Sequence, residues 1–99
     1  MAKKKSIAEQ ELEDFDLVFK ALGHRTRRNI LVVLQARGGS LAVRHIVARF
    51  NLAWPTVTRH LQLLEAAGLV TQTRVSRELI YEFNGQRMKD VVANWMKWF

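Results

Sequence analysis

The segment from Val43 to Phe83 most constrains how this chain can fold. It contains the chain's only proline, Pro55, followed by apolar residues at spacings of four and three. Proline suits the first turn of a helix, where its missing N–H would have no intrahelical partner. The sequence therefore predicts a helix from Pro55 to about Ala67 with one buried face, made of Val57, Leu61 and Leu64. The other faces carry hydroxyl, guanidinium and amide groups, those of Thr56, Thr58, Arg59 and Gln62.

Apolar periodicity and breaker residues predict the elements on either side of this helix. Four more helices are expected, at about residues 8–22, 26–36, 43–50 and 86–99. Two strands with alternating apolar residues are expected to form a hairpin, at residues 69–75 and 79–83. The first helix is expected to carry one apolar stripe, formed by Leu12, Phe15, Phe19 and Leu22. The chain is thus predicted to be mainly α-helical with a small β-hairpin, as one domain over residues 8–99 behind a basic, flexible tail, residues 1–7.

Charge is unevenly distributed along the 99 residues, whose formal net charge is +7. Residues 1–20 hold four lysines and five acids, whereas residues 21–99 hold twelve lysines and arginines against four acids. A domain this basic favours a polyanionic partner, because each phosphate that a protein neutralises releases condensed counterions. Nucleic acid is therefore the expected partner, the alternative being a basic surface that only maintains solubility.

Several classes of protein are disfavoured by the composition. The absence of cysteine excludes disulfides and thiolate metal sites. The apolar runs are too short to span a bilayer, and no apolar stretch typical of a signal peptide follows the basic N-terminus. We therefore expect a cytoplasmic protein without a membrane partner. No nucleophile–base pair, phosphate-binding glycine loop or carboxylate pair indicates an enzyme.

Two strings of residues resemble patterns of the ArsR/SmtB family of bacterial repressors. Residues 19–31, FKALGHRTRRNIL, are similar to the family's F-x-A-L-x-D-P-T-R-R-x-I-L. Residues 55–70, PTVTRHLQLLEAAGLV, resemble its P-T-V-S-R-H-L-x-x-L-x-x-A-G-L-V and are the more specific match. The resemblance covers about residues 15–83. It implies a winged helix-turn-helix fold, with five helices and a two-stranded wing, and a function in repressing transcription.

The sequence departs from the family pattern at three places. His24 and Arg25 replace Asp-Pro, so either Thr26 or His24 is expected to cap the second helix. The hairpin tip lacks the usual glycine. Metal-sensing members carry C-V-C in the third helix, whereas this chain has Ala-Val-Arg at residues 42–44. With its three histidines on different elements, the chain is expected to bind no metal and no cofactor, although a site joining a histidine to an acid of the first helix stays open, at Glu9, Glu11 or Asp14.

The resemblance places the helix after Pro55 in the major groove of DNA. An α-helix fits this groove, and an arginine there can bond to guanine through two donors. From this helix, the expected contacts are Thr56, Thr58, Arg59, His60 and Gln62. His60 has an alternative role in packing at the base of the hairpin. Arg74 and Arg77 near the hairpin tip are expected to reach the flanking backbone or minor groove.

Arginines outside the central helix are also expected to meet phosphates. In a helix-turn-helix the first helix crosses the DNA backbone, so Arg44 and Arg49 are expected to contact it. Arg27 and Arg28 match the family's T-R-R string, and one of them is expected to pair with an acid inside the fold rather than with phosphate.

Large apolar side chains crowd the C-terminal region, including three of the chain's aromatic residues, Trp95, Trp98 and Phe99. So many rings are unusual at the exposed end of a lone domain. The family dimerises through its first and last helices. The expected dimer contacts are Leu12, Phe15, Met88, Val91, Trp95 and Phe99. A monomeric core and a small-molecule pocket are the alternatives.

These observations predict a homodimeric repressor that binds double-stranded DNA at a pseudo-palindromic operator. Two alternatives stay open: a member of the same family that responds to a metal or small molecule, and a winged helix used as a protein-interaction module. The sequence predicts neither the operator, nor the target genes, nor the effector.

Overall fold

The computed structural model describes residues 6–99, which form five helices and three strands. In chain order these are α1 (Ile7–Leu22), α2 (Arg25–Ala36), β1 (Ser40–Ala42), α3 (Val43–Arg49), α4 (Trp54–Ala66), β2 (Val70–Val75), β3 (Glu78–Phe83) and α5 (Gly85–Met96). Every predicted helix and the predicted hairpin are present, which confirms a mainly helical winged helix-turn-helix. The helix expected to end at Phe99 is shorter, because α5 ends at Met96.

The start of α1 differs from the prediction of a flexible tail over residues 1–7. Residues 1–5 of that tail lie outside the described residues. Ser6 caps α1, since its Oγ accepts the Glu9 N–H at 3.1 Å and its own N–H donates to the Glu9 carboxylate at 3.3 Å. This reciprocal pair is a capping box, which satisfies two backbone donors at once. Ser6 and Ile7 therefore belong to the helical domain.

The wing is part of a three-stranded antiparallel sheet in the order β1-β3-β2, where a two-stranded hairpin was predicted. β2 and β3 pair from Val70 with Phe83 to Val75 with Glu78, which confirms the hairpin. β1 adds to the other edge of β3, with Leu41 opposite Tyr81. Gly38 and Gly39 precede β1 with φ of 89° and 99°, a backbone that glycine adopts without steric cost. This turn brings the short strand against β3.

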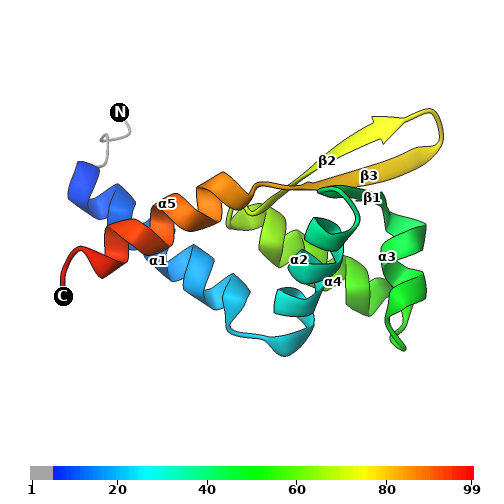
Figure 1. The fold of residues 1–99 in the computed structure, drawn as a ribbon, viewed down its shortest axis with the longest axis horizontal. Coiled ribbons are helices and arrows are strands. Elements are labelled where there is room, and N and C mark those ends of the chain that lie inside the picture. The colour runs from blue at the N-terminus through cyan, green and yellow to red at the C-terminus, as the bar shows by residue number, and fades with distance from the viewer. Residues whose placement is uncertain (1–5) are drawn as a thin grey trace, which may run out of the picture.

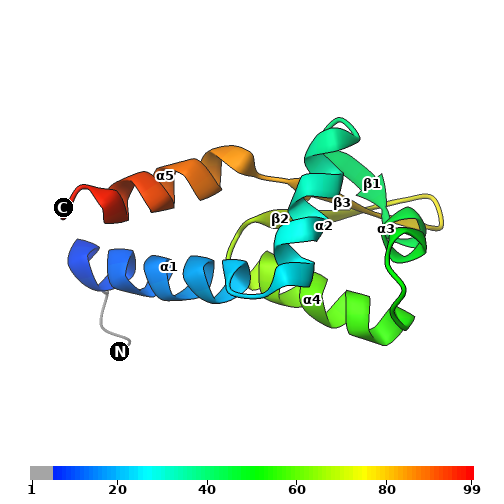
Figure 2. The same ribbon diagram turned by 60° about the horizontal axis from the view of Figure 1, so that its bottom comes forward.

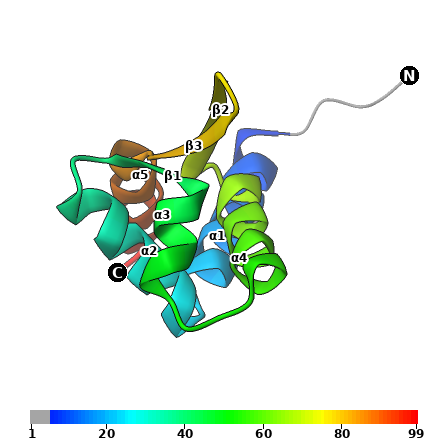
Figure 3. The same cartoon turned by 90° about the vertical axis from the view of Figure 1, so that its right-hand side faces the viewer.

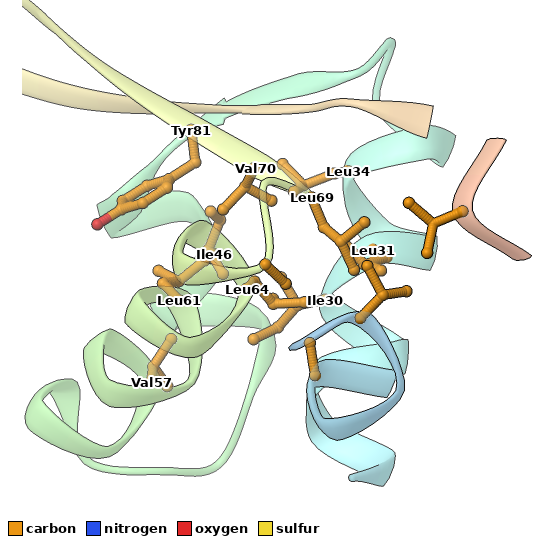
Figure 4. Close-up of a cluster of buried hydrophobic side chains, with 14 of the residues drawn as sticks. Ile30, Leu31, Leu34, Ile46, Val57, Leu61, Leu64, Leu69, Val70 and Tyr81 are labelled. Atoms are coloured by element: carbon orange, nitrogen blue, oxygen red, sulfur yellow. The ribbon is translucent and has the colours of Figure 1, made fainter. Parts of the chain in front are cut away.

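The hydrophobic core surrounds the buried face of α4. Val57, Leu61 and Leu64 have no exposed surface, as their spacing predicted. Figure 4 shows them meeting Ile30 of α2 and Ile46 of α3. Each such side chain contributes roughly 1.5–3 kcal/mol by leaving water. The core therefore holds α4 by one face and leaves the opposite face outside.

The elements divide between two ends of an elongated molecule. α1 and α5 run antiparallel at one end, while α3 and the tip of the wing lie at the other (Figures 1 and 2). An ion pair between Arg87 Nη2 and Asp14 Oδ1, 3.1 Å long, joins α5 to α1. Figure 3 shows α3 and α4 side by side, with the wing projecting beyond them. Within residues 6–99, no helix combines the length and apolar character needed to cross a membrane.

The buried stripe of α1 is displaced from the predicted one. Phe15 is buried as expected, but the next buried residues are Val18 and Ala21. Leu12 is 61% exposed, and Phe19 and Leu22 only pack against the core from its edge. The first turns of α1 extend past the core toward α5, so apolar side chains there have no buried partner layer. Periodicity alone could not indicate where the core ends.

Candidate nucleic-acid interface

The face of α4 that lies opposite the core is polar and exposed. Thr56, Arg59 and Gln62 are all exposed, whereas Val57 and Leu61 are fully buried. Pro55 stands in the first turn, as predicted, and the Ala53 carbonyl accepts the first helical N–H groups. The helix therefore presents a guanidinium, an amide and a hydroxyl to solvent, which agrees with their predicted positions away from the buried face.

Thr58 lies toward the wing and is only partly exposed. Its Oγ donates to the Trp54 carbonyl at 3.0 Å, so the hydroxyl proton already has a partner. A ligand could still meet the methyl group or the oxygen lone pairs of Thr58.

A hollow of about 560 Å³ separates α4 from the wing. Its lining includes Thr58, Gln62, Glu65, Gln72 and Tyr81. Gln72 Nε2 donates to Glu65 Oε1 at 3.2 Å between strand and helix. Burial, with the Glu65 carboxylate nearby, raises the pKa of the Tyr81 phenol. Amide, carboxylate and phenol groups can all form hydrogen bonds with base edges or sugars.

His60 does not take one of the two roles considered for it, packing at the base of the hairpin. Its Nδ1 lies 3.2 Å from Nη1 of Arg27, and its ring lies 4.6 Å from the His24 ring, centroid to centroid. It therefore packs against the start of α2 and not at the base of the hairpin, and one ring nitrogen is engaged there. Burial, then the charges of His24, Arg27 and Arg59, lower the pKa of the His60 imidazole.

Arg27 and Arg28 contact carbonyl oxygens, whereas one of them was expected to pair with an acid. Arg27 is buried and donates to the Ala21 carbonyl at 2.7 Å. Arg28 is exposed and donates from Nη1 to the Leu22 carbonyl at 2.8 Å. Both carbonyls lie at the end of α1, where the helix dipole favours cations. The prediction of a carboxylate partner was wrong, because the carbonyl oxygens at the end of a helix attract a guanidinium as a carboxylate does.

His24 caps α2, which decides between the two candidates considered. Its Nδ1 accepts the Thr26 N–H at 3.1 Å. The imidazole thereby supplies the side-chain acceptor that Asp, Asn, Ser or Thr more often provides at this position.

The wing projects two exposed arginines, Arg74 and Arg77, near its tip. Its turn lies at Ser76 and Arg77, between the paired residues Val75 and Glu78. Ser76 has φ of 58°, a left-handed conformation in which glycine is more common. The tip thus keeps a tight turn without glycine, and its guanidinium groups extend into solvent.

On α3, Arg49 is exposed, while Arg44 is both exposed and ion-paired. The Arg44 guanidinium bonds to the carboxylate of Glu78 at the start of β3. Sequence reasoning missed this pair, because the two residues are 34 positions apart and belong to different elements. A phosphate at Arg44 would have to compete with Glu78.

The residues expected at a dimer interface divide into exposed and buried groups. Leu12, Trp95 and Phe99 are exposed at the end formed by α1 and α5. Phe15 and Val91, in contrast, are buried within this chain's own core, which leaves them little surface for a second copy. Met88 is partly buried and packs against the same core. Trp98, one of the three rings noted at the C-terminal end, is also exposed there, and so are Ile7 and Met96, which were not predicted.

The exposed rings at this end contact one another. Trp95 lies 5.1 Å from Phe19, in an edge-to-face arrangement, and 5.0 Å from Phe99, measured between centroids. Trp98 is 73% exposed and Phe99 is 89% exposed. Contiguous exposed apolar side chains of this kind mark interaction surfaces in proteins.

Residues 6–99 contain no group of three or more His, Asp or Glu side chains able to hold a metal ion. Asp14, one of the acids left open as a ligand, pairs with Arg87 and accepts from Gln10. His24 and His60 adjoin each other beside a buried guanidinium, which disfavours a cation.

Comparisons with known proteins are consistent with these features. Residues 24–78, from the cap of α2 to the first residue of β3, match the MarR family. The chain is 34% identical to the transcriptional repressor SdpR of Bacillus subtilis over 79 residues, 80% of this chain and 84% of that protein. It is 35% identical to the HTH-type transcriptional repressor SmtB of Mycobacterium tuberculosis over 66% of this chain and 48% of that one.

A solved structure from Mycobacterium bovis also resembles this fold. It is a homodimeric winged helix-turn-helix DNA-binding domain, described as a possible ArsR-family transcriptional regulator. The two chains superpose with a TM-score of 0.76 at 25% identity, over 97% of this chain and 88% of the other.

Proposed function

This chain belongs to the ArsR/SmtB-type winged helix-turn-helix transcriptional regulators, and its residues 24–78 also match the MarR family. From that membership we propose that it is a homodimeric repressor that binds a pseudo-palindromic operator. In the proposed complex, α4 of each copy is the recognition helix and enters the major groove. The two recognition helices then lie about 34 Å apart, one turn of the duplex, on the same side of the DNA.

The observation that carries this proposal is the exposed face of α4. Arg59 points away from the core, with Thr56 and Gln62 on the same helix and no buried role for any of the three. In the major groove an arginine can bond to O6 and N7 of guanine, and a glutamine can bond to adenine. We therefore assign base reading to these side chains and to Thr58.

Phosphate contacts are assigned to the arginines that flank α4. Arg74 and Arg77 on the wing would reach the backbone or minor groove beside the site, and Arg49 on α3 would contact the backbone where that helix crosses it. Arg44 would do so once its pair with Glu78 is exchanged for phosphate. The His60 side chain is directed to the start of α2, so its contribution is to hold the helix and not to read DNA.

The exposed apolar residues of α1, α5 and the C-terminal end support a second copy as the other partner. A two-fold axis at this end would bury Leu12, Trp95, Trp98 and Phe99 of both copies, and would leave the α4 faces open for DNA. Such a regulator acts on DNA in the cytoplasm. Its effector, if one exists, is not a metal held by thiolates, because the chain has no cysteine.

The test is a salt titration on a duplex that the protein itself selects from a random pool. Binding to this duplex and to a shuffled duplex is measured by fluorescence anisotropy at increasing salt. We expect tighter binding to the selected duplex and a log–log slope of about −0.9 for each phosphate that the protein neutralises. Flat salt dependence, or equal affinity for both duplexes, would contradict the proposal and favour a protein-interaction module.

A further inference from the structure

Arg27 joins three helices at the place where α1 ends, α2 begins and α4 passes. Its Nε donates to the Ala21 carbonyl at 2.7 Å, and its Nη2 donates to the Lys20 carbonyl at 2.9 Å. Both acceptors lie in the last turn of α1, whose dipole favours a cation. The remaining Nη1 lies 3.2 Å from His60 Nδ1 on α4. One buried side chain therefore fastens α4 to the end of α1.

Two imidazoles at this junction act as hydrogen-bond acceptors. A guanidinium has only donors, so the contact with Arg27 requires that Nδ1 of His60 carry no proton. The Thr26 N–H likewise donates to His24 Nδ1, so this nitrogen carries no proton either. The two rings are tilted by 45° at a centroid distance of 4.6 Å. Both contacts as observed need the uncharged form of histidine.

The charges that face His60 all oppose its protonation. They belong to His24 and Arg27, at the start of α2, and to Arg59 on α4 itself. A proton on His60 Nδ1 would place an imidazolium 3.2 Å from the Arg27 guanidinium and remove the acceptor between them. A proton on His24 Nδ1 would remove the cap of α2. Protonation of His60 therefore disrupts the contact that joins Arg27 to α4.

We propose that Arg27, His60 and His24 form a pH-sensitive clamp that positions α4 for reading DNA. This inference rests on the proposed function, because it assigns a regulation to the same helix. His60 adjoins Arg59 in sequence, so the clamp helps to fix the position of the backbone from which the Arg59 side chain leaves the helix. When the imidazoles are neutral, α4 is held against α1 and α2. When His60 is protonated, the contact between Arg27 and α4 is lost, and the core face of the helix alone positions it.

The clamp predicts that acid affects specific and non-specific binding differently. Specific recognition requires each side chain within about half an ångström of its productive position. Non-specific binding depends mainly on charge, and protonated histidines add positive charge. We therefore expect acidification to reduce the ratio of specific to non-specific affinity without weakening non-specific binding.

The experiment measures this ratio by fluorescence anisotropy for a selected and a shuffled duplex, in steps from about pH 7.5 down to the lowest pH at which the protein stays folded, because the pKa of His60 lies below its usual value. In His60→Gln, the amide oxygen can accept from Arg27 without titrating, so the ratio should become nearly independent of pH. His24→Asn keeps a good helix cap and is combined with it in a double variant. His45→Gln is the matched control, because His45 is exposed on α3 and outside the clamp.

For the wild-type protein and His45→Gln, we expect the ratio to fall as the pH decreases, because a proton on His60 Nδ1 removes the acceptor that faces Arg27. His60→Gln and the double variant should change by less than about two-fold. A pH-independent ratio in the wild type would overturn the clamp, and so would a fall in His60→Gln equal to that of the wild type. Loss of the pH dependence in His45→Gln would show that His45, and not the clamp, produces it.

A second readout needs no DNA and separates failure of the clamp from failure of the proposed function. In NMR spectra of the protein alone, the Nη–H signals of the Arg27 guanidinium should shift as the His60 ring is protonated, because Nη1 lies 3.2 Å from His60 Nδ1. If these signals do not follow the ring, the clamp is wrong even where DNA binding is specific. If they follow it and no duplex is bound specifically, the clamp is supported and the proposed function fails.

Discussion

Arg44 on α3 and Glu78 at the start of β3 form an ion pair that connects the helix-turn-helix to the wing. Both side chains are substantially exposed, so the pair adds little to the stability of the fold. Its greater effect is on the DNA-facing end of the molecule, because Glu78 neutralises a guanidinium that phosphate would otherwise attract.

Replacement of Glu78 by glutamine should therefore strengthen DNA binding. The affinity should rise because Arg44 no longer has to give up its pair with Glu78 before it contacts phosphate, while the log–log salt slope should stay close to that of the wild type. Glu82→Gln removes the same charge from an exposed position on the same strand and is the matched control. An equal gain in affinity in the two variants would show that the loss of a negative charge, and not the release of Arg44, produces the effect.

Arg59→Ala should weaken binding to the selected duplex by about 1–3 kcal/mol and relax the preference at one base pair. The reason is that Arg59 is exposed on the face of α4 opposite the core. Arg37→Ala serves as control, since Arg37 is exposed at the end of α2. The measurement is a repeat of the duplex selection with each variant. An unchanged base preference in Arg59→Ala would remove this residue from sequence reading.

Trp95→Glu should convert the proposed dimer to a monomer, because it would bury a carboxylate without a partner in the interface. Phe99→Glu tests the same interface at a residue that is 89% exposed and therefore contributes little to the fold. Analytical ultracentrifugation measures the mass, and circular dichroism checks that each variant is folded. If both variants are folded and both still sediment as dimers, the interface lies elsewhere.

Leu61→Ala should lower the free energy of unfolding by about 2–5 kcal/mol, the range for a large buried side chain replaced by alanine. Leu61 has no exposed surface and lies at the centre of the contact of α4 with the core. Val32→Ala, at an exposed position of α2, should change it by less than about 0.5 kcal/mol. Urea denaturation measures both, and similar losses in the two variants would contradict this description of the core.

The free energy of unfolding should also fall as the pH decreases. Folding lowers the pKa of His60, so in the pH range between the folded and unfolded values the unfolded chain binds more protons. The contribution of His60 to the free energy of unfolding is complete above the pKa that this residue has in the unfolded chain. It is lost as the pH falls through the lower pKa that His60 has in the folded protein. His60→Gln should flatten this part of the pH profile in thermal melts, and a profile identical to that of the wild type would assign the loss to other groups.

The local features of the fold could be predicted from the sequence because local patterns produce them. The spacing of Val57, Leu61 and Leu64 sets the buried face of α4, and Pro55 marks its first turn. The exposed positions of Thr56, Arg59 and Gln62 follow from that same spacing. Family resemblance then supplied the arrangement of the helices and the wing.

Contacts between distant parts of the chain could not be predicted in this way. Arg44 meets Glu78 and Arg27 meets His60 across more than thirty residues, and no local pattern indicates either pair. Phe15 and Val91 illustrate another limit of periodicity. An apolar residue at helical spacing can face the core of its own chain or a second copy, and only the position of the core decides between them.

The central claim, that the exposed face of α4 reads DNA, is tested most directly by NMR chemical shifts on addition of the selected duplex. The claim predicts the largest shifts at the amides of Thr56, Arg59 and Gln62 and at the wing, with small shifts at Leu12 and Trp95. Large shifts at α1 and α5, with the α4 amides unchanged, would contradict it.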